Sequence, residues 1–244
     1  MSAEGKTAIV TGASRGIGRA IAERLGRDGA QLVVHYQKNK EGAEEVVAAV
    51  RKAGGRAMSV AGDVSSAADV RAVYEAARTE FGGVDIVVNN AAMGAGGPIE
   101  YMSEAEFDRV VAVNLRSVFL SGQEAVRHLA DGGRIVNVGA RVPAAAVSML
   151  GVYGATKAGV EVLTRSLAHQ LGGRGITVNA VGPGPTDTDM LGPDARANLA
   201  MIVNGTPLGR LGLPADVAGV VSFLTGADAG WITGQTIYVD GGFN

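Results

Sequence analysis

The stretch TGASRGIGRA, residues 11–20, decides the fold prediction, because it joins a short apolar run to a long amphipathic one. Its glycines allow a tight turn, a close approach of backbone N–H groups to a pyrophosphate, and close packing of a helix on a sheet. The N-terminus of the following helix attracts anions. Because the cluster lies between a strand and a helix, it indicates a dinucleotide-binding loop rather than a merely structural turn. The loop residues that we expect to contact such a cofactor are Gly12, Ser14, Arg15, Gly16, Ile17 and Gly18.

Outward from this loop, short apolar runs alternate with longer amphipathic runs along most of the chain. The predicted strands are Lys6–Gly12, Gln31–Tyr36, Ala57–Asp63, Asp85–Ala92, Arg134–Gly139, Ile176–Gly184 and Thr236–Gly242. The predicted helices are Gly16–Asp28, Glu41–Gly54, Ala67–Phe81, Ser103–Leu129 and Tyr153–Leu171. Strands that are apolar throughout and separated by helices indicate a parallel sheet covered on both faces. We therefore predict one α/β domain over residues 1–244, a doubly wound Rossmann-type fold with seven parallel strands and helices on both faces. The Gly- and Pro-rich piece near residues 185–208 is expected to form a mobile lid.

The composition excludes several classes of protein. With 22 basic and 24 acidic residues, the formal charge of −2 provides no general attraction for nucleic acid or an anionic membrane. No apolar run approaches the roughly 18–20 residues needed to span a bilayer, and the N-terminus lacks a signal-peptide pattern. The chain has no cysteine, and its three histidines are too scattered to suggest a metal site. We expect a soluble, cytoplasmic protein without a metal.

The end of the second predicted strand bears on the choice of cofactor. An NAD-preferring site needs an acidic residue there to accept hydrogen bonds from the ribose hydroxyls. This chain has Tyr36 and Lys38 at that point and no carboxylate, while Arg15 lies in the glycine loop. Two cations and no acid favour the 2′-phosphate of NADP(H). The alternative is that Arg15 and Lys38 are solvated surface charges.

Several ordered motifs now carry a resemblance. They are TGASRGIG (11–18), Asp63–Val64, NNAA (89–92), Asn114, YGATK (153–157), PGPTDT (183–188) and VDGG (239–242). Together they resemble the short-chain dehydrogenase/reductase family in its compact form, over essentially the whole chain, and within it the 3-oxoacyl-carrier-protein reductases and related carbonyl reductases. The resemblance implies an NADP(H)-dependent oxidoreductase that interconverts a carbonyl, or an imine, and the alcohol or amine. It also implies a homotetramer packed through the helices near Ser103–Leu129 and Tyr153–Leu171.

The family's catalytic groups map onto three positions of this sequence. In similar enzymes a tyrosine and a lysine four residues apart share one helix face, as Tyr153 and Lys157 would here. The tyrosine hydroxyl is the acid/base, and the neighbouring ammonium is expected to move its pKa down from about 10. Lys157 would also hold the nicotinamide ribose. Asn114 would hold a water that relays protons to Lys157, although an asparagine there could equally bond to a local backbone group.

The resemblance also implies further cofactor contacts and a substrate pocket. Asp63 and Val64 resemble the adenine contact, Asn90 and Ala91 resemble the wall beside the cofactor ribose, and Ala92 replaces a glycine usual in the family. The segment that orients the nicotinamide carboxamide is represented by Pro183, Gly184 and Thr188. The pocket is expected from Met93–Ile99, Val142–Val152 and Pro185–Leu208. These segments are mainly apolar, which favours a hydrophobic carbonyl substrate.

One catalytic group of the family is missing. Its serine, usually thirteen residues before the tyrosine, falls on Ala140. Losing one such donor typically costs ~2.7–4 kcal/mol, or roughly 10²–10³ in rate. The chain could be a disabled or engineered variant, an enzyme whose substrate stabilises its own charge, an enzyme in which Ser148 or Arg141 replaces the serine, or a non-catalytic NADP(H)-binding protein. The retained Tyr153 and Lys157 argue against full loss of catalysis.

Overall fold

The computed structural model describes residues 3–142 and 146–243. Its strands form one seven-stranded sheet in the order β3-β2-β1-β4-β5-β6-β7. Every pair of neighbouring strands is parallel. The strands are β1 Thr7–Val10, β2 Gln31–Tyr36, β3 Ala57–Ala61, β4 Val84–Asn89, β5 Leu129–Val138, β6 Thr177–Pro183 and β7 Thr236–Val239. The predicted fold class is confirmed.

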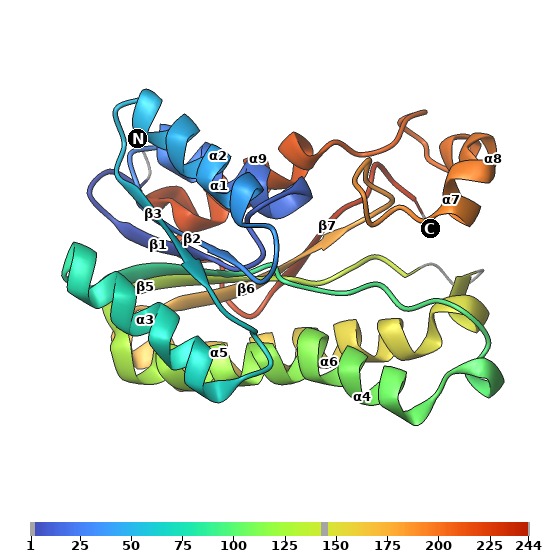
Figure 1. Ribbon diagram of the computed structural model, residues 1–244, viewed down its shortest axis with the longest axis horizontal. Helices are drawn as coiled ribbons and strands as arrows, with labels where there is room; N and C mark the ends of the chain where they lie inside the picture. The colour runs from blue at the N-terminus through green and yellow to red at the C-terminus, as the bar shows by residue number, and fades with distance from the viewer. Residues whose placement is uncertain (1–2, 143–145, 244) are drawn as a thin grey trace.

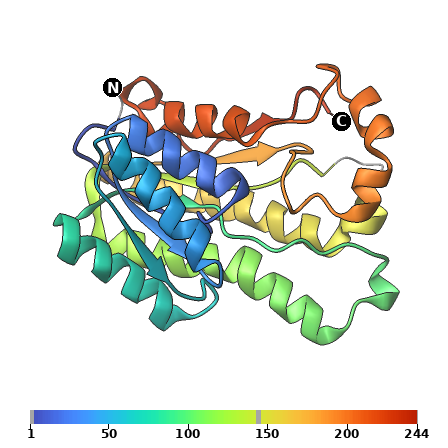
Figure 2. The same cartoon turned by 45° about the horizontal axis from the view of Figure 1, so that its top comes forward.

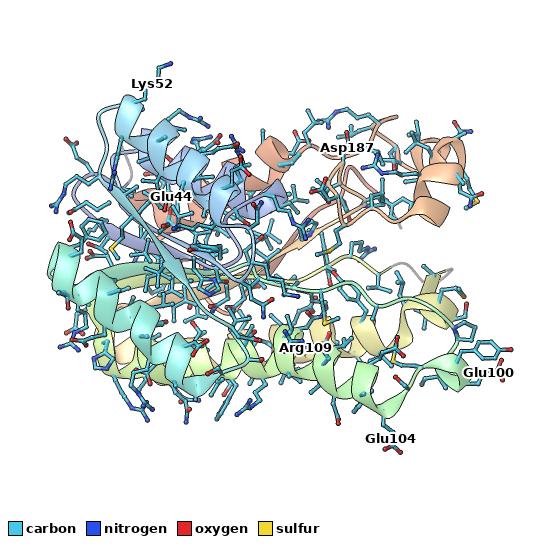
Figure 3. All side chains as sticks on the ribbon, in the orientation of Figure 1. Glu44, Lys52, Glu100, Glu104, Arg109 and Asp187 are labelled. Carbon is cyan, nitrogen blue, oxygen red and sulfur yellow. The ribbon has the colours of Figure 1, made fainter. Side chains whose placement is uncertain are left out.

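Helices cover both faces of the sheet (Figure 1). One face carries α1 Gly16–Arg27, α2 Lys40–Lys52 and α9 Pro214–Thr225, and Figure 2 shows α1 lying between the other two. The opposite face carries α3 Ala67–Phe81, α5 Ser117–His128 and α6 Val147–Leu171, and α4 Glu104–Val111 extends α5. Charged side chains lie on the outer sides of these helices, and Lys52 and Glu104 point away from the body of the molecule in Figure 3.

The strand β1 shows why its sequence is apolar at every position. Ala8 and Val10 belong to the core under α1, α2 and α9, whereas Ile9 belongs to the core under α3, α5 and α6. All three side chains are fully buried. Successive strand residues point to opposite faces, so a strand covered on both sides has no position left for a polar side chain facing water.

Several element boundaries differ from the prediction, and two elements begin five or more residues before their predicted start. Strand β5 begins at Leu129, five residues before the predicted Arg134, because Leu129 pairs with Val84 and the chain then bulges before pairing resumes. Gly132 in this bulge has φ +73°, a conformation that favours glycine. Helix α6 begins at Val147, six residues before the predicted Tyr153.

Helix α9 was not predicted at all. Its start carries an ordinary signal, with Pro214 in the first turn and Asp216 closing a capping interaction. Its interior is apolar nearly all round because it is packed against α1 and the sheet, with Val217, Val221 and Leu224 at most 1% exposed. A helix buried in this way has no amphipathic period to detect.

The long helix predicted at Ser103–Leu129 is interrupted. A capping box of Ser103 and Glu106 starts α4, and the turns at Ala112–Arg116 have π geometry before α5 begins. The segment predicted to form a lid contains the short helices α7 Pro193–Ala197 and α8 Leu199–Asn204. Single 3₁₀ turns occur at Ile99–Tyr101, Gly172–Arg174 and Ala227–Ala229. Within the described ranges, none of the helices has the length and apolarity to cross a membrane.

Candidate active site

The predicted site residues gather at one edge of the sheet. Gly12 follows β1, Asn90 follows β4, Ala140 follows β5 and Gly184 follows β6. These strands are parallel, so their carboxyl ends meet at the same edge, and β1 and β4 are neighbours although they are far apart in the chain. The strand order reverses between β1 and β4, which is where open α/β sheets bind their ligands.

The glycine loop is shaped as the sequence predicts. Gly12 and Gly16 have φ +63° and +56°, in the left-handed region. A Cβ at Gly18 would lie 2.4 Å from both the Asn90 Nδ2 and the Gly12 carbonyl oxygen, so only glycine fits. Helix α1 begins after the loop without a side-chain hydrogen bond capping it. Its first N–H groups therefore face the loop as an anion-binding end.

Thr11 and Asn90 lock this loop to the end of β4. The Thr11 hydroxyl accepts hydrogen bonds from the backbone N–H groups of Asn90 and Ala91, both at 3.0 Å. The Asn90 amide donates to the carbonyl oxygens of Thr11 and Gly12, at 2.9 and 3.1 Å. Thr11 was not singled out from the sequence, because a threonine at the end of a strand has no distinguishing pattern.

The residues expected to bind a 2′-phosphate lie near the same loop. Tyr36 is buried at the end of β2, and Lys38 beyond it is exposed. The Arg15 side chain is 69% exposed and lies 3.4 Å from the carboxylate of Asp189 in the lid segment. Such an exposed pair is weak, so Arg15 remains available to a phosphate.

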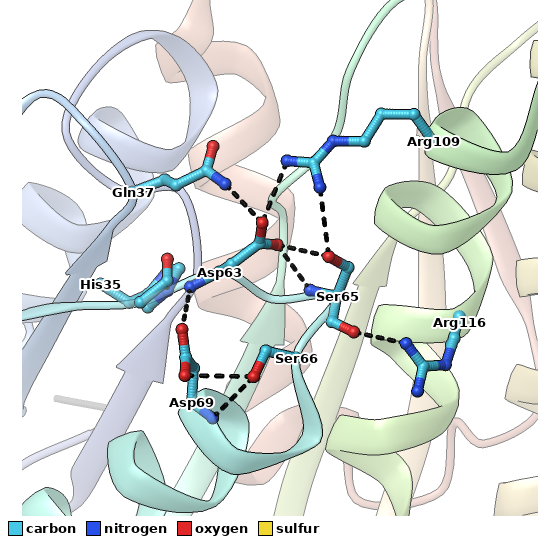
Figure 4. A network of polar contacts seen from close by, with 9 residues as sticks. His35, Gln37, Asp63, Ser65, Ser66, Asp69, Arg109 and Arg116 are labelled. Carbon is cyan, nitrogen blue, oxygen red and sulfur yellow. Dashed lines mark hydrogen bonds and ion pairs between the residues drawn. The ribbon is translucent and has the colours of Figure 1, made fainter. Parts of the chain in front are cut away.

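Asp63, the predicted adenine contact, is the centre of a polar network after the end of β3 (Figure 4). Its carboxylate accepts hydrogen bonds from the Gln37 amide at 2.7 Å, the Arg109 guanidinium at 3.0 Å, and the backbone and hydroxyl of Ser65. Burial by itself would raise the pKa of Asp63, but the hydrogen bonds from Ser65 and Arg109 outweigh it and hold that pKa below its usual value. Its neighbour Val64 is buried. No sequence signal connects Arg109 on α4 with Asp63, because only the fold brings them together.

Tyr153 and Lys157 share one face of α6, as predicted. Lys157 is 3% exposed, its Nζ donates to the carbonyl oxygen of Val138 at 2.8 Å, and it lies 5.7 Å from the centre of the Tyr153 ring. Burial lowers the pKa of Lys157 to about 8 and raises the pKa of Tyr153 to about 12. The expectation that the ammonium lowers the tyrosine pKa is therefore wrong for this arrangement, because desolvation dominates and Nζ is directed to a carbonyl.

Asn114 lies in the π turn between α4 and α5 and is 1% exposed. Its side-chain oxygen accepts from the Met93 N–H at 2.9 Å, and its amide nitrogen donates to the Met93 carbonyl oxygen at 3.0 Å and lies 3.4 Å from the Thr156 hydroxyl. The side chain thus follows the second of the two expectations, a bond to backbone. It fixes the start of the Met93–Ile99 segment next to the Tyr153 helix.

Ala140 stands at the end of β5, partly buried, where the backbone is held on both sides. The N–H of Gly139 donates to the Val181 carbonyl oxygen at 2.7 Å, and that of Arg141 donates to the Pro183 carbonyl oxygen at 2.8 Å. The Arg141 guanidinium turns towards β7, 4.7 Å from the centre of the Tyr238 ring and 3.6 Å from the Asp240 carboxylate. The hypothesis that Arg141 replaces the missing hydroxyl is therefore not supported. Ser148 is exposed in the first turn of α6.

The segment after β6 approaches the glycine loop. A Cβ at Gly184 would lie 2.8 Å from the Asp240 backbone, so Gly184 allows close packing after Pro183. The methyl group of Thr188 lies next to Gly16, where a Cβ would be 3.4 Å away. Of the predicted carboxamide-binding residues, Thr188 thus lies beside the glycine loop, whereas Gly184 packs against the chain after β7.

Large apolar side chains are exposed on the three segments predicted to form the substrate pocket. The Gly97 N–H donates to the Met149 carbonyl oxygen at 2.8 Å, which joins two of the three predicted pocket segments. Gly94 faces Met190 of the third segment. Exposed apolar residues of these segments are Ile99, Val147, Met149, Met190, Leu199, Met201 and Leu208. Residues 143–145 of the predicted pocket lie outside the described residues.

Known proteins share both the sequence and the fold. A family profile described as Enoyl-(Acyl carrier protein) reductase matches residues 12–244. An uncharacterized oxidoreductase of Methylorubrum extorquens is 43% identical, and the match covers 98% of each chain. Tetrahydroxynaphthalene reductase of Pyricularia oryzae is 40% identical over 99% of this chain and 90% of its own. A short-chain dehydrogenase from Burkholderia cenocepacia, solved in complex with NADP, is 40% identical, covers 100% of both chains and superposes with a TM-score of 0.93.

Sequence identity of 40–43% over at least 98% of this chain shows common family membership, whereas a shared sheet topology alone would show only a common fold. The relatives named above are an oxidoreductase and a reductase, and the Burkholderia dehydrogenase was solved in complex with NADP. The glycine cradle at Gly18, the uncapped start of α1 and the absence of an acidic residue at Tyr36–Lys38 fit an NADP(H) cofactor. The chain is a member of the short-chain dehydrogenase/reductase family of oxidoreductases.

Proposed function

We propose that this protein is an NADP(H)-dependent reductase that converts a carbonyl compound, or an imine, into the alcohol or amine. The observation that carries the proposal is the pair of Tyr153 and Lys157, held on one face of α6 at the carboxyl edge of the sheet, with Lys157 buried and anchored to Val138. Burying a lysine side chain costs free energy, and buried lysines with a shifted pKa are therefore found mostly at functional sites. Its place beside a nucleotide cradle supports hydride chemistry.

The cofactor would be held by groups of this chain that are already in position. The first N–H groups of α1 would bind the pyrophosphate, Asp63 and Val64 would contact the adenine, and Arg15 and Lys38 would bind the 2′-phosphate. Bound NADPH supplies the hydride. Asn90 and Ala91 would form the wall beside the ribose, and Pro183, Gly184 and Thr188 would orient the carboxamide.

Tyr153 would supply the proton. Because burial raises its pKa to about 12, its hydroxyl stays protonated at neutral pH, which suits a proton donor in the direction of reduction. Lys157, with its pKa lowered by burial to about 8, remains charged at neutral pH and has two further N–H groups besides the one directed to Val138. These would hold the ribose hydroxyls and provide a proton path to Tyr153. Asn114 would position the backbone next to this pair.

Ala140 weakens the site at the substrate oxygen, where a hydroxyl donor would help to stabilise developing charge. Arg141 is directed elsewhere, so we expect either a slower enzyme or a substrate with a hydrogen-bond donor of its own. Ser148 is the remaining candidate for a substitute. The alternative function is a non-catalytic NADP(H)-binding protein on the same fold.

The substrate class is inferred from the apolar side chains exposed on the three predicted pocket segments. Ile99, Met149, Met201 and Leu208 are between 49% and 75% exposed and come from all three pocket segments. Apolar surface of this kind favours a hydrophobic ketone, since covering it removes it from water. The name of the relative tetrahydroxynaphthalene reductase supports a substrate of the fused-ring aromatic class.

The test is the rate of NADPH oxidation with fused-ring ketones, β-ketoesters and cyclic imines, for the wild-type chain, Ala140→Ser and Tyr153→Phe. We expect turnover by the wild type, loss of at least roughly 100-fold in kcat for Tyr153→Phe, and a gain of up to roughly 10²–10³-fold for Ala140→Ser. A fast wild type that gains nothing from serine would assign the role to Ser148 or the substrate. NADPH binding without turnover by any of the three would favour the non-catalytic alternative.

We also propose that the protein is a homotetramer. Phe107, Phe119, Val126 and Val162 are 41–55% exposed on α4, α5 and α6, the helices of one face of the molecule. Apolar side chains gathered on helices that lie side by side support packing against a second copy. Analytical ultracentrifugation tests this, and a monomer at micromolar concentration would refute it.

A further inference from the structure

The imidazole of His35 joins two parts of the nucleotide site that are far apart in sequence. His35 lies on β2 and is 2% exposed. The backbone N–H of Gly12, the first glycine of the phosphate loop, donates to His35 Nδ1 at 3.3 Å. The other ring nitrogen, Nε2, lies 3.1 Å from the carbonyl oxygen of Gly62, immediately before the adenine contact Asp63.

These two partners determine the protonation state of the ring. The Gly12 N–H can only donate, so Nδ1 must carry a lone pair, and the Gly62 carbonyl can only accept, so Nε2 must carry the proton. A neutral imidazole in this tautomer satisfies both groups at once. A protonated ring would place an N–H at Nδ1 against the N–H of Gly12 and break the link to the loop.

The surroundings of the ring favour the neutral form. The titratable groups facing it are Asp63 from the turn between β3 and α3, and Asp69 and Tyr74 from α3. Residues of β1, β4 and α5 that line the small cavity beside it are uncharged. Burial lowers the pKa of His35, and it outweighs the Gly62 hydrogen bond and the two carboxylates, which act in the opposite direction.

The loop depends on this residue through both its backbone and its side chain. The Ala13 N–H donates to the His35 carbonyl oxygen at 2.9 Å, next to the Gly12 bond to the ring. On the other side, the Gly62 N–H donates to the Tyr36 carbonyl oxygen at 3.0 Å. The ring is therefore a bridge between the pyrophosphate loop and the adenine-side turn, with one glycine at each end.

We propose that neutral His35 is a positioning residue that sets the phosphate loop against the adenine-side turn, so that NADP(H) binding weakens at acid pH when the ring takes up a proton. The inference rests on the proposed NADP(H) site, since it concerns how that site is held. His35 lies on β2, whereas the proposed catalytic pair of Tyr153 and Lys157 lies on α6. Its loss therefore raises the Kd and KM for NADPH and leaves kcat at saturating NADPH nearly unchanged.

Two substitutions separate the parts of the bridge. His35→Asn places an amide oxygen at the position of Nδ1, so it keeps an acceptor for Gly12 but does not titrate. His35→Leu removes both contacts. The exposed His169 provides a matched control as His169→Asn. At pH 7.5 we expect the Kd for NADPH to rise less than about fivefold in His35→Asn and at least tenfold in His35→Leu.

The pH profile of Kd between pH 5 and 8 is the second readout. The 2′-phosphate itself titrates near pH ~6, so the signal is the ratio of Kd between the wild type and His35→Asn. Because burial lowers the pKa of His35, we expect the wild type to lose affinity more steeply than His35→Asn towards the acid end of this range. A ratio that stays constant down to pH 5 overturns the proposal, as does tight binding by His35→Leu.

The tautomer is read directly by ¹⁵N NMR of histidine-labelled protein without cofactor. We expect a lone-pair Nδ1 and a protonated Nε2 for the signal that disappears in His35→Asn. A protonated Nδ1 at pH 7 overturns the positioning role even if NADPH binds. If the expected tautomer is seen but the wild type does not bind NADPH at pH 7.5, the proposed cofactor fails and the role in binding fails with it.

Discussion

Replacing Lys157 by methionine should stabilise the folded protein while it removes the ammonium from the site. Burial lowers the pKa of Lys157 from 10.5 to about 8, and each pH unit corresponds to ~1.4 kcal/mol. The buried charge therefore costs the folded state about 3 kcal/mol at pH 7. Methionine has a similar shape, but it leaves the Val138 carbonyl without its 2.8 Å partner, which costs ~1–2 kcal/mol. The net gain is about 1–2 kcal/mol.

The gain should depend on pH with a definite sign. Below about pH 8 lysine is charged in both the folded and the unfolded state, and the full penalty is present. Between about 8 and 10.5 the unfolded chain holds the proton and the folded one does not, so wild-type stability rises with pH relative to the variant. Near pH 10.5 the penalty is gone, and the unpaired carbonyl leaves the variant the less stable of the two.

Urea-induced unfolding followed by circular dichroism at pH 7, 8.5 and 10 measures this difference. The exposed Lys52 serves as the control, since Lys52→Met should change stability by less than ~0.5 kcal/mol at each pH. A Lys157→Met variant that is less stable than the wild type at pH 7 would refute the reasoning. So would a difference that does not vary with pH. NADPH-dependent ketone reduction should be lost in the same variant.

Three further substitutions test other parts of the site. Gly18→Ala should raise the Kd for NADPH at least tenfold by calorimetry, since its Cβ would lie 2.4 Å from Asn90 Nδ2, and unchanged affinity would contradict the close packing of the loop. Arg15→Gln should lower the NADPH-to-NADH ratio of kcat/KM roughly tenfold, because it removes a charge facing the 2′-phosphate; a constant ratio in steady-state kinetics would assign that preference elsewhere. Asn137→Leu should destabilise the fold by ~2–4 kcal/mol in urea unfolding, because two buried 2.8 Å hydrogen bonds to side chains of β4 and α6 are lost. An unchanged urea midpoint would show that the two hydrogen bonds of the Asn137 side chain contribute little to stability.

Most of the architecture could be predicted because it is encoded locally. A strand buried on both faces must be apolar at successive positions, as in β1, and the glycine loop needs residues without a Cβ. The start of β5 could not be predicted, because the bulge at Gly132 interrupts the strand pattern. The start of α6 could not be predicted either, because its first six residues, from Val147, carry no strong helical pattern. Helix α9 was missed because burial removes the amphipathic period on which the prediction relies.

The candidate site was predicted in its residues more fully than in its contacts. Tyr153 and Lys157 share a helix face simply because they are four positions apart, which sequence spacing decides. Their pKa directions depend on burial by the whole fold, and there the expectation for Tyr153 was wrong. For Asn114, the sequence left open whether the side chain holds a water or bonds to a local backbone group. The fold places the Met93 backbone against it, which decides for the backbone.

The sequence by itself determined that this chain folds as a parallel α/β sheet with a glycine-rich loop after the first strand, because periodicity and glycine positions are properties of neighbouring residues. The resemblance to a family then implied the pair of Tyr153 and Lys157. Only the tertiary structure decided that Arg109 binds Asp63, that Arg141 turns to β7, and that His35 bridges two glycines. Those partners lie 23 to 97 residues apart in the chain, and no local pattern specifies contacts at that separation.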